Sequence, residues 1–437
     1  MRILLINPPI SSATVMPYSI ACMKSFLGST IDEEVSVLDL NAEYHFRKFR
    51  ELYESKDEFF GRLEEFLSMS KKDMPSVSKK TILGKKLDFE DELFDEIIKR
   101  DPDFAAMSLV YNSQVFYAAR IIKKLEKRGV KTIIGGPADL SKLSKKAIVL
   151  KNYHEFSEFL IRKGAKKHEK KNILDFSDFE KKNYFTKDII YPLRSAYSCP
   201  YQQCTFCTHH QGPYSRISIS ELRQAVEKNK MKKISFIDDG FTPQSLEELS
   251  EMLESFDVSW WCQLRPVKEF ASLLDKVNSS GLNSIAWGVE SGSQKVLDLM
   301  QKCTNVRDVE DVLRKAKNAG IINMVYIMFG FPGETEKDFY ETIEFLKRNS
   351  SSIDLVSVSV FGLQKGSWVY MDPERFGVEI FKEKRTFLGE KLRYEVKKGL
   401  SHKRATELKK KHMHEIRKIN KIPEVINACK EQVLNLD

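Results

Sequence analysis

The sequence predicts an α/β protein with a doubly wound N-terminal domain, a partial (β/α)6 barrel and a helical C-terminal region. Three observations predict this architecture. Short apolar strands alternate with amphipathic helices in two separate series, a lysine-rich stretch lies between the series, and the alternation stops near residue 370. With 437 residues, the chain has the length of two or three domains.

The first series occupies residues 1–165. Its expected strands are 3–7, 35–40, 104–110, 130–134 and 147–150, and its expected helices are 18–27, 115–128 and 153–162. Residues from about 42 to 100 are rich in Phe, Glu and Lys with helical periodicity, which predicts a helical insertion. The alternation predicts a parallel sheet covered by helices, with a ligand crevice at the carboxyl ends of the strands.

A linker is expected at residues 166–190, because the run KGAKKHEKK at 163–171 is polar and highly charged. The second series follows at residues 191–370. Its expected strands are 194–197, 233–237, 259–264, 284–289, 323–329 and 355–360. Six strand–helix units without a hairpin signal favour a partial barrel, open at one side, with its chemistry at the strand ends. Residues 371–437 lack the alternation and are expected to form a mostly helical domain.

Composition narrows the function classes. No run approaches the ~20 apolar residues of a membrane helix, and the first residues lack a signal-peptide cleavage pattern, so a soluble, cytoplasmic protein is expected. The net charge is 71 − 62 = +9, and residues 381–437 carry 16 Lys and Arg against 8 Asp and Glu, or +8 of that excess. This basic tail indicates either a solvated helical face or a contact with an acidic partner.

Three of the seven cysteines lie within nine residues, directly after the first expected barrel strand. They are Cys199, Cys204 and Cys207. Three close thiolates without a fourth ligand favour a [4Fe–4S] cluster bound through three irons, with the fourth iron open to a substrate. A zinc site completed by His209 or His210 is the alternative.

The cysteine loop and several further motifs resemble the radical S-adenosylmethionine (SAM) enzymes. The motifs are Phe206 within the loop, the Asp238-Asp239 pair, GVESG at 288–292 and FGFPGET at 329–335. Together with ILLINPP at 3–9 and GGP at 135–137, they resemble the cobalamin-dependent class B radical SAM methyltransferases, in which a Rossmann-like cobalamin-binding domain precedes the barrel. The resemblance covers about 1–40, 100–165 and 190–370. One departure is the spacing, because the family has three residues between its first two cysteines and this chain has four.

The resemblance implies a SAM site at the strand ends of the barrel. The implied SAM-binding residues are Phe206, Asp238, Asp239, Arg265, Glu290 and Ser291. In this interpretation the two aspartates accept from the SAM ammonium, Arg265 pairs with its carboxylate, and Glu290 accepts from the ribose hydroxyls. An external one-electron reductant then drives cleavage of SAM to the 5′-deoxyadenosyl radical.

The N-terminal domain lacks GxGxxG after its first strand, which disfavours dinucleotide binding. The resemblance implies cobalamin there, held by Asn7, Pro8, Ser108, Tyr111, Asn112, Gly135, Gly136 and Pro137. Because the chain has no Asp-x-His-x-x-Gly motif, the cobalamin is expected with its own base displaced. Its lower face is then empty or touched near Tyr111 or Asn112, the two expected catalytic residues. A domain that has lost cobalamin is the alternative.

The leading function is a cobalamin-dependent radical SAM methyltransferase that adds a methyl group to an unactivated carbon. The basic C-terminal region favours a peptide or protein side chain as substrate, and nucleic acid is not expected. The alternatives are radical ring formation, C–C coupling or rearrangement without methyl transfer, and a non-catalytic scaffold that binds protein or nucleic acid. The cysteine triplet argues against the scaffold. Methylthiolation is disfavoured because the N-terminal domain holds only Cys22.

Overall fold

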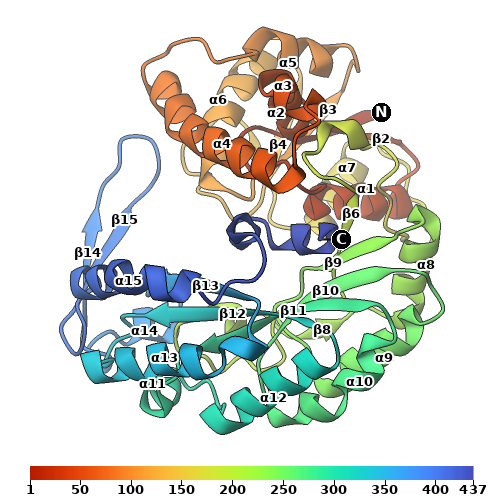
Figure 1. Ribbon diagram of the computed structural model, residues 1–437. Helices are drawn as coiled ribbons and strands as arrows, with labels where there is room; N and C mark the ends of the chain where they lie inside the picture. Colours follow the sequence, from red (N-terminus) through yellow and green to blue (C-terminus); the bar gives the residue numbers. More distant parts are fainter. Residues whose placement is uncertain (437) are drawn as a thin grey trace. The chain divides into compact units, whose positions relative to one another are not determined.

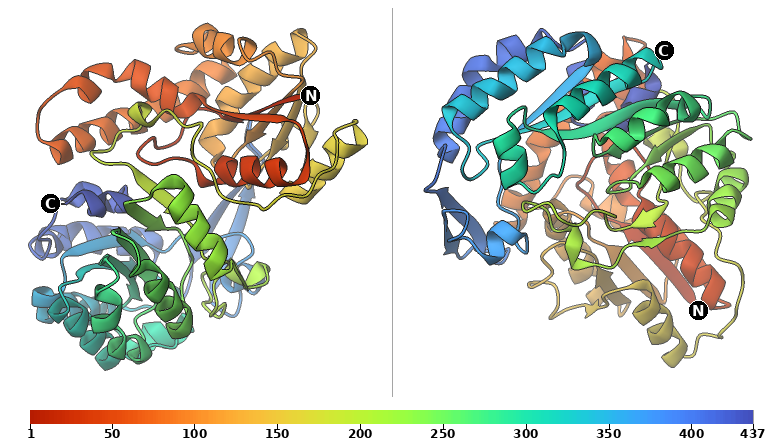
Figure 2. Two further views of the ribbon diagram at one scale, coloured as in Figure 1. Left: turned by 90° about the vertical axis from the view of Figure 1, so that its right-hand side faces the viewer. Right: turned by 90° about the horizontal axis from the view of Figure 1, so that it is seen from below.

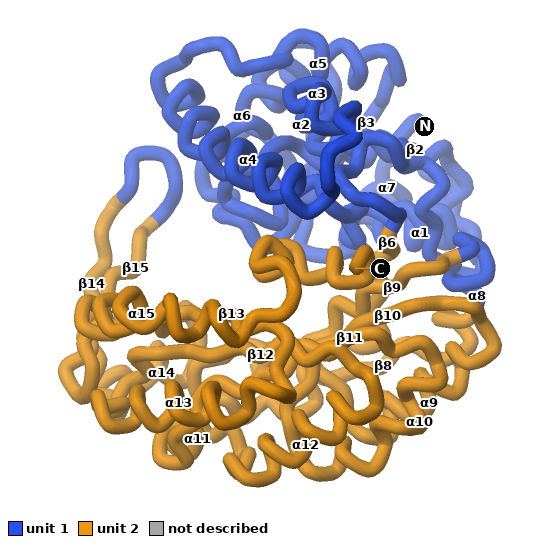
Figure 3. The backbone as a smooth tube through the Cα atoms, in the orientation of Figure 1, with its two compact units in different colours: residues 1–189, 224–230, 385–389 blue, residues 190–223, 231–384, 390–437 orange. Residues whose placement is uncertain are grey.

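The computed structural model describes residues 1–436, which form two compact units (Figures 1 and 3). Unit 1 comprises residues 1–189, 224–230 and 385–389, and unit 2 comprises the other described residues. Each unit contains a parallel sheet with helices, so the predicted α/β class is confirmed. No helix among residues 1–436 combines the length and the apolar character that crossing a membrane requires.

Unit 1 is built on a five-stranded sheet in the order β2-β1-β3-β4-β5, and every pair in it is parallel. The strands are β1 (Arg2–Asn7), β2 (Glu34–Asp39), β3 (Phe104–Ser108), β4 (Lys131–Gly135) and β5 (Ile148–Val149). Helix α1 (Tyr18–Thr30) connects β1 to β2, α6 (Asn112–Lys127) connects β3 to β4, and α7 (Tyr153–Arg162) follows β5. All five residues of β3 are buried, as expected for a central parallel strand covered on both faces.

The expected helical insertion forms α2 (Leu40–Lys48), α3 (Arg50–Glu54), α4 (Phe59–Ile82) and α5 (Glu90–Ile98). Buried polar groups hold α4 against α2. The His45 Nε2 lies 2.9 Å from Ser70 Oγ, and the Tyr44 hydroxyl donates to Asp73 at 2.6 Å. Burial lowers the pKa of His45 to about 4, so this imidazole is neutral and has a structural role.

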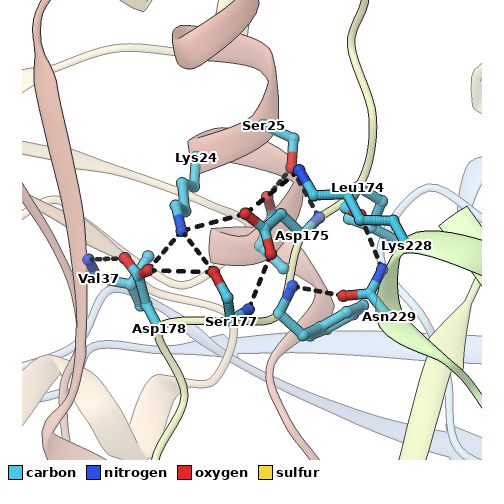
Figure 4. Close-up of polar contacts among 11 residues, drawn as sticks. Lys24, Ser25, Val37, Leu174, Asp175, Ser177, Asp178, Lys228 and Asn229 are labelled. Carbon is cyan, nitrogen blue, oxygen red and sulfur yellow. Dashed lines mark hydrogen bonds and ion pairs between the residues drawn. The ribbon is translucent and has the colours of Figure 1, made fainter.

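Residues 166–189 were expected as part of a linker, but they pack against unit 1. Phe176 is buried, and its backbone N–H donates to Asn229 Oδ1 at 2.9 Å (Figure 4). The Lys24 ammonium contacts Asp178 at 2.5 Å and Asp175 at 3.5 Å. The sequence suggested a linker because of the lysine run at 163–171. The buried residue that packs this segment into unit 1, Phe176, follows only after that run.

Unit 2 contains a six-stranded parallel sheet in the order β13-β12-β11-β10-β9-β6. Its strands are β6 (Ile190–Leu193), β9 (Lys233–Phe236), β10 (Ser259–Leu264), β11 (Leu282–Glu290), β12 (Ile322–Phe329) and β13 (Leu355–Val360). The helices α9 (Pro243–Leu253), α10 (Leu274–Asn278), α11 (Gln294–Leu299), α12 (Val306–Asn318) and α13 (Glu336–Arg348) lie along its outer side (Figures 1 and 2). This is the partial barrel that the alternation predicted.

The start of the barrel differs from the prediction. The first strand is β6, whereas the expected strand 194–197 contributes only β7 (Ala196–Tyr197), which pairs antiparallel with β8 (Ser215–Arg216). The reason is burial: all four residues of β6 are buried against β9, while Tyr197 is exposed. The cysteine loop therefore lies inside a small hairpin that the sequence did not indicate.

The prediction of a mostly helical C-terminal region is wrong for residues 378–396. These form an antiparallel hairpin of β14 (Val378–Glu383) and β15 (Lys391–Val396), in which Ile380 lies opposite Tyr394. Charged and apolar residues alternate along β15, whereas β14 has the adjacent apolar residues Ile380 and Phe381, and the high charge of the region obscures this incomplete period-2 pattern. The helical expectation is confirmed at α15 (His402–Arg417), which packs on β13, and the short helix α14 (Trp368–Met371) precedes the hairpin.

Candidate functional site

A cavity of about 430 Å³ opens at the carboxyl ends of the strands in unit 2. Its lining includes Cys199, Cys204, Phe206, Cys207, His209, Asp239, Arg265, Glu290, Lys302 and Tyr326. Strand ends of β9, β10 and β11 supply Asp239, Arg265 and Glu290 to it, as the parallel topology predicts. The structure thus brings the cysteine motif and most of the expected SAM residues into one space.

Hydrogen bonds fix the cysteine loop at its centre. Thr205 is buried, its N–H donates to Met300 O at 3.0 Å, and its carbonyl accepts from Val369 N at 3.1 Å. The Cys207 N–H donates to Cys204 O at 3.1 Å, which turns the last two cysteines toward the same side. The loop is therefore held from two segments that follow it by about 95 and 165 residues.

Gln202 shows how the loop accommodates its extra residue. It lies between Cys199 and Cys204 in the left-handed region, with a φ of 57°. Its amide nitrogen donates to Ser198 Oγ at 3.1 Å and to Gly212 O at 2.9 Å, so the side chain ties the widened arc back to the hairpin. The four-residue spacing is compatible with three cysteines that line one cavity.

The thiols lie in a low-dielectric setting with one opposing cation. Burial raises the pKa of Cys204 to about 11 and also raises that of Cys207, while Lys302 acts in the opposite direction on both. No three His, Cys, Asp or Glu side chains of residues 1–436 form a single-ion site. In a [4Fe–4S] cluster each thiolate binds a different iron, so the ligands need to share a cavity rather than one point. The donor set fits such a cluster, and metal binding would release the thiol protons.

Lys302 is the functional residue that the sequence analysis missed. Its ammonium lies 3.0 Å from Glu290 Oε1 and 5.8 Å from the ring centroid of Phe206. A Cβ at Gly288 would lie 2.8 Å from Lys302 Nζ and 2.9 Å from Glu290 Oε1, so the glycine of the GVESG motif makes room for this pair. In the sequence, Lys302 is marked only by its position two residues after the mostly apolar segment VLDLM at 296–300.

Arg265 lines the cavity, but its donors have partners within the protein. The guanidinium stacks on Tyr201, with 3.7 Å from its central carbon to the ring centroid. It also donates to Lys302 O at 3.0 Å and Cys303 O at 3.3 Å. Arg265 therefore positions the segment that carries Lys302, and Lys302 is a buried cation that lowers the pKa of both Cys204 and Cys207 against the effect of burial.

The structure separates the two aspartates. Asp238 is buried and accepts from Ser195 Oγ and Ala196 N, each at 2.7 Å, and burial raises its pKa to about 6. Asp239 lines the cavity and lies 3.2 Å from His209 Nδ1. The expectation that both carboxylates face SAM is thus corrected for Asp238, which holds the start of the small hairpin.

Ser291 also has a structural environment. Its hydroxyl lies 3.0 Å from Thr342 Oγ1 and accepts from Ser293 N at 3.1 Å, and the side chain is buried away from the cavity lining. The residue was expected among the SAM contacts because it follows Glu290. Ser291 lies just beyond the end of β11 and contacts Thr342 of α13, whereas Glu290, the last residue of the strand, lines the cavity.

The FGFPGET motif contains a buried carboxyl group, Glu334. One of its oxygens accepts from Gly330 N, and the other, Oε1, has no hydrogen-bond partner in the described structure. Burial raises the pKa of Glu334 to about 8. The group is therefore protonated near neutral pH, and it holds the turn at Gly330, whose φ is 76°.

Unit 1 has a cavity of about 270 Å³ at the carboxyl ends of β3 and β4. Its lining includes Ser19, Met23, Ser108, Gly135, Gly136, Pro137, Tyr153 and Phe156. Gly136 has a φ of 112°, and a Cβ there would lie 2.3 Å from Leu109 O; a Cβ at Gly135 would lie 2.8 Å from Leu150 O. The two glycines are thus required by the packing of the backbone itself.

Four expected cobalamin residues do not line this cavity. Asn7 is buried, donates to Asp39 Oδ1 at 3.0 Å and accepts from Gln114 Nε2 at 2.9 Å. The same Gln114 nitrogen donates to the carbonyl of Pro8 at 2.9 Å. The remaining two, Tyr111 and Asn112, were also the expected catalytic residues. In the structure, Asn7, Pro8 and Asn112 make hydrogen bonds that fix the loops after the strands. The sequence analysis did not identify Gln114, whose side chain bonds to both Asn7 and Pro8.

Tyr111 and Asn112 lie at the start of α6. Tyr111 is 58% exposed, and Asn112 Oδ1 accepts from Asp139 N at 2.8 Å. Neither is part of the cavity lining in unit 1. Their catalytic role stays a prediction, and the exposure of the Tyr111 ring leaves its face open to a ligand.

Residues 194–346 match the Radical SAM superfamily. An uncharacterized methyltransferase, PH0819 of Pyrococcus horikoshii, is 28% identical over 162 residues, 34% of this chain and 35% of that protein. The ribosomal protein uS12 methylthiotransferase RimO of Thermosipho melanesiensis is 26% identical over 163 residues, 33% of this chain and 38% of that protein. The chain therefore covers less than two fifths of the length of these relatives.

Two solved structures share the fold over most of the chain. The radical SAM methyltransferase TsrM from Kitasatospora setae, with cobalamin and a [4Fe–4S] cluster bound, matches with a TM-score of 0.59 and 15% identity, over 92% of this chain and 83% of that chain. The cobalamin-dependent SAM radical enzyme OxsB matches with a TM-score of 0.57 and 13% identity, over 86% and 56%. Residues 194–346 are thus similar to the Radical SAM superfamily, and the fold is similar to that of two cobalamin-dependent radical SAM enzymes, so the resemblance that the motifs indicated is confirmed.

Proposed function

We propose that the protein is a cobalamin-dependent radical SAM methyltransferase that methylates an unactivated carbon. The observation that carries the proposal is the cavity of unit 2, where three cysteines and a buried Lys302–Glu290 pair share one space within a radical SAM domain. The fold match to TsrM and OxsB supports the methyltransferase class.

In this proposal the cysteines bind three irons, and the cavity holds SAM. Lys302 is placed to pair with the SAM carboxylate, a role first expected for Arg265, because its ammonium is buried beside the cysteines. Glu290 is oriented by that ammonium and accepts from the ribose hydroxyls, while Asp239 accepts from the SAM amino group. The cluster, when bound and reduced, supplies the electron that cleaves SAM.

Unit 1 would hold cobalamin, with its nucleotide tail in the 270 Å³ cavity. The lining fits a flat aromatic base, because it combines apolar side chains such as Met23 and Phe156 with backbone of the glycine turn. Ser108 contributes a hydroxyl that also lies 3.1 Å from Ser19 Oγ. Cobalamin supplies the methyl carrier in this class of chemistry, and the protein orients it.

The experiment is anaerobic turnover of the reconstituted chain with SAM, reductant and cell extract, followed by mass spectrometry. A methylated polypeptide gains roughly 14 Da per added group, and SAM deuterated in its methyl group raises the gain by about 3 Da. Formation of 5′-deoxyadenosine without a deuterium-bearing product would instead favour radical ring formation, coupling or rearrangement. An acidic polypeptide is the substrate we expect first, because residues 381–437 carry +8.

A further inference from the structure

Unit 1 contains a second cavity, of about 250 Å³, at the carboxyl end of β2. Its lining includes Asp39 at the end of that strand, Glu43 in the first turn of α2, and Asn183 of the 3₁₀ turn η1 (Lys181–Asn183). The lining shares no residue with the other cavity of unit 1 or with the cysteine cavity of unit 2. Because ligands of open α/β sheets bind outside the carboxyl ends of the strands, this position suits a further ligand.

Asp39 is a carboxylate that has hydrogen bonds but no counter-cation. Its Oδ1 accepts from Asn7 Nδ2 at 3.0 Å and from Ala42 N at 2.9 Å, and its Oδ2 accepts from the Tyr184 hydroxyl at 2.7 Å. All three donors are neutral, and no lysine, arginine or histidine of residues 1–436 forms an ion pair with this carboxylate. Burial raises the pKa of Asp39, because the surroundings disfavour the charged form. A positive charge in the cavity would stabilise that form.

Asn183 supplies a hydrogen-bond acceptor that has no donor. The residue is 4% exposed, and its Nδ2 donates to Glu43 Oε2 at 2.7 Å, while its Oδ1 has no hydrogen-bond partner in the described structure. The contact with Glu43 fixes the orientation of the amide, since a flipped amide would bring two oxygens together. Buried polar atoms of native proteins are nearly always paired, so this oxygen indicates a donor that comes from a ligand. A water molecule would satisfy the oxygen but would bring no charge to Asp39.

The other acidic side chains of the lining already have cations. Asp178 lies 2.5 Å from the Lys24 ammonium and also accepts from Val37 N (Figure 4). Glu43 Oε1 lies 2.7 Å from Arg47 Nε. The remaining two contact basic side chains as well: Glu96 contacts Lys99 and Arg100, and Glu180 contacts Lys182. The missing positive charge is therefore a property of the Asp39 position and not of a generally acidic surface.

We propose that this cavity binds the ammonium group of a small aliphatic amine, with Asp39 as its counter-charge and Asn183 Oδ1 as a further acceptor. A primary ammonium carries three N–H donors and no acceptor, which matches a site that lacks both a charge and a donor. Val37, Leu38 and Phe179 line the same cavity and offer apolar surface to the methylene groups. The volume lies below the ~300–1,000 Å³ of pockets for drug-sized ligands, so the amine is small.

A metal ion fits this lining less well than an ammonium group. Among residues 1–436, no three His, Cys, Asp or Glu side chains are placed to bind one ion. The inference goes beyond the proposed function and does not depend on it, because neither the iron ligands nor the residues of the other unit 1 cavity take part.

The test is calorimetric titration of the full-length protein with n-butylamine and with n-butanol, near neutral pH and at constant ionic strength. The two probes have the same carbon chain, and only the amine carries a charge. Asp39→Asn removes the counter-charge and keeps one acceptor oxygen, whereas Ala42→Leu fills the cavity and keeps every polar group of the lining. We expect butylamine to bind the parent, and each variant to weaken its affinity on the order of tenfold or more.

The matched control is Asp175→Asn. This carboxylate belongs to the same segment and contacts Lys24 at 3.5 Å and Lys228 at 3.4 Å, but it does not line the cavity. Its variant should bind butylamine within about twofold of the parent. Thermal unfolding of each variant identifies any that fails to fold, and the cavity variant that does fold then decides the result.

Four results would overturn the inference. Butylamine that gives no binding heat with the parent would remove the site. Equal affinities for butylamine in the parent and in a folded cavity variant would place the amine elsewhere on the protein. Butanol that binds as tightly as butylamine would remove the role of charge, and binding of magnesium chloride without binding of butylamine would identify a metal site instead. None of these measurements requires iron or cobalamin, so they leave the proposed function untouched.

Discussion

Lys302 Nζ and Glu290 Oε1 lie 3.0 Å apart, and both residues are buried. Each member of a buried ion pair is kept ionised by the other member, so removing one of them leaves an uncompensated buried charge. Here the pair borders the cavity and the cysteines, so its two charges face a ligand as well as each other. That arrangement suits a zwitterion such as the amino-acid part of SAM.

We predict that Lys302→Met lowers both stability and SAM affinity. Loss of one partner from a buried pair destabilises by ~3–5 kcal/mol, because Glu290 stays behind without its cation. The double variant Lys302→Met, Glu290→Gln should recover much of the stability and none of the SAM affinity. Thermal unfolding and calorimetric titration with SAM measure the two effects. Full SAM affinity in the double variant would contradict the assignment.

Glu290→Ala should weaken SAM binding while the cluster assembles normally. Removing a charged hydrogen-bond acceptor costs on the order of 1.5–3 kcal/mol, or about tenfold to a hundredfold in affinity. The control is Glu341→Ala, which removes a glutamate of α13 whose side chain is 42% exposed. If SAM titrates the Glu290 variant and the parent equally, Glu290 has only a structural role.

The reconstituted protein should contain about four irons and four sulfides per chain. Replacing Cys199, Cys204 and Cys207 together by Ala should abolish the visible absorption and the iron content. Cys303→Ala is the matched control, because this cysteine is exposed and near Tyr201 but outside the cavity lining. Retention of iron by the triple variant would show that the ligands lie elsewhere.

Most strand positions in both units were predictable from the sequence, because buried parallel strands leave continuous apolar runs such as residues 3–6 of β1. The hairpin of β14 and β15 was not predictable, because its many charged residues resemble a solvated helix in the sequence. Some of these charges pair across the two strands, as Arg393 does with Glu383, and this pairing appears only in the folded structure. The local periodicity of apolar residues indicates which residues are buried, but it does not indicate which charged residues pair across distant segments.

In the candidate site, too, some features were predictable from the sequence and others were not. Motif spacing located the cysteines, Asp239 and Glu290, because strand ends bring them together in any parallel barrel. Which carboxylate faces the cavity could not be read from the sequence, because it depends on the hydrogen bonds that Asp238 accepts from Ser195 and Ala196, residues more than 40 positions away. A buried cation such as Lys302 is likewise visible only once the fold places it.

Glu334 predicts a pH-dependent stability. Its pKa rises from 4.5 in the unfolded chain to about 8 in the folded protein, so the folded state keeps a proton that the unfolded state has lost. The contribution is therefore complete below pH 4.5 and is lost as the pH rises toward 8, by up to ~1.4 kcal/mol per pH unit. Glu334→Gln, which mimics the protonated group, should show a smaller loss of unfolding free energy between pH 6 and 9, on the order of a few kcal/mol less. Parallel pH profiles from denaturant titration would contradict the shifted pKa.

The cavity of unit 1 gives a cleaner test of cobalamin binding than its glycines do. Substitution of Gly136 would drive a Cβ into Leu109 O, so a loss of cobalamin there would report backbone damage as much as a blocked tail. Ser108 lines the same cavity from the end of β3 and has ordinary strand geometry. We expect Ser108→Phe to fill the space of the displaced base and to lower the cobalamin retained after desalting several-fold, roughly 1 kcal/mol or more.

Ser108→Ala is the control, because it loses only the contact with Ser19 Oγ and should retain cobalamin close to the parent level. Thermal unfolding of both variants separates occupancy from stability. In the cob(II)alamin form, electron paramagnetic resonance should show no coupling to an axial nitrogen, since the base lies in the cavity and no histidine motif replaces it. Nitrogen coupling, or equal cobalamin retention by Ser108→Phe and the parent, would place the tail outside this cavity.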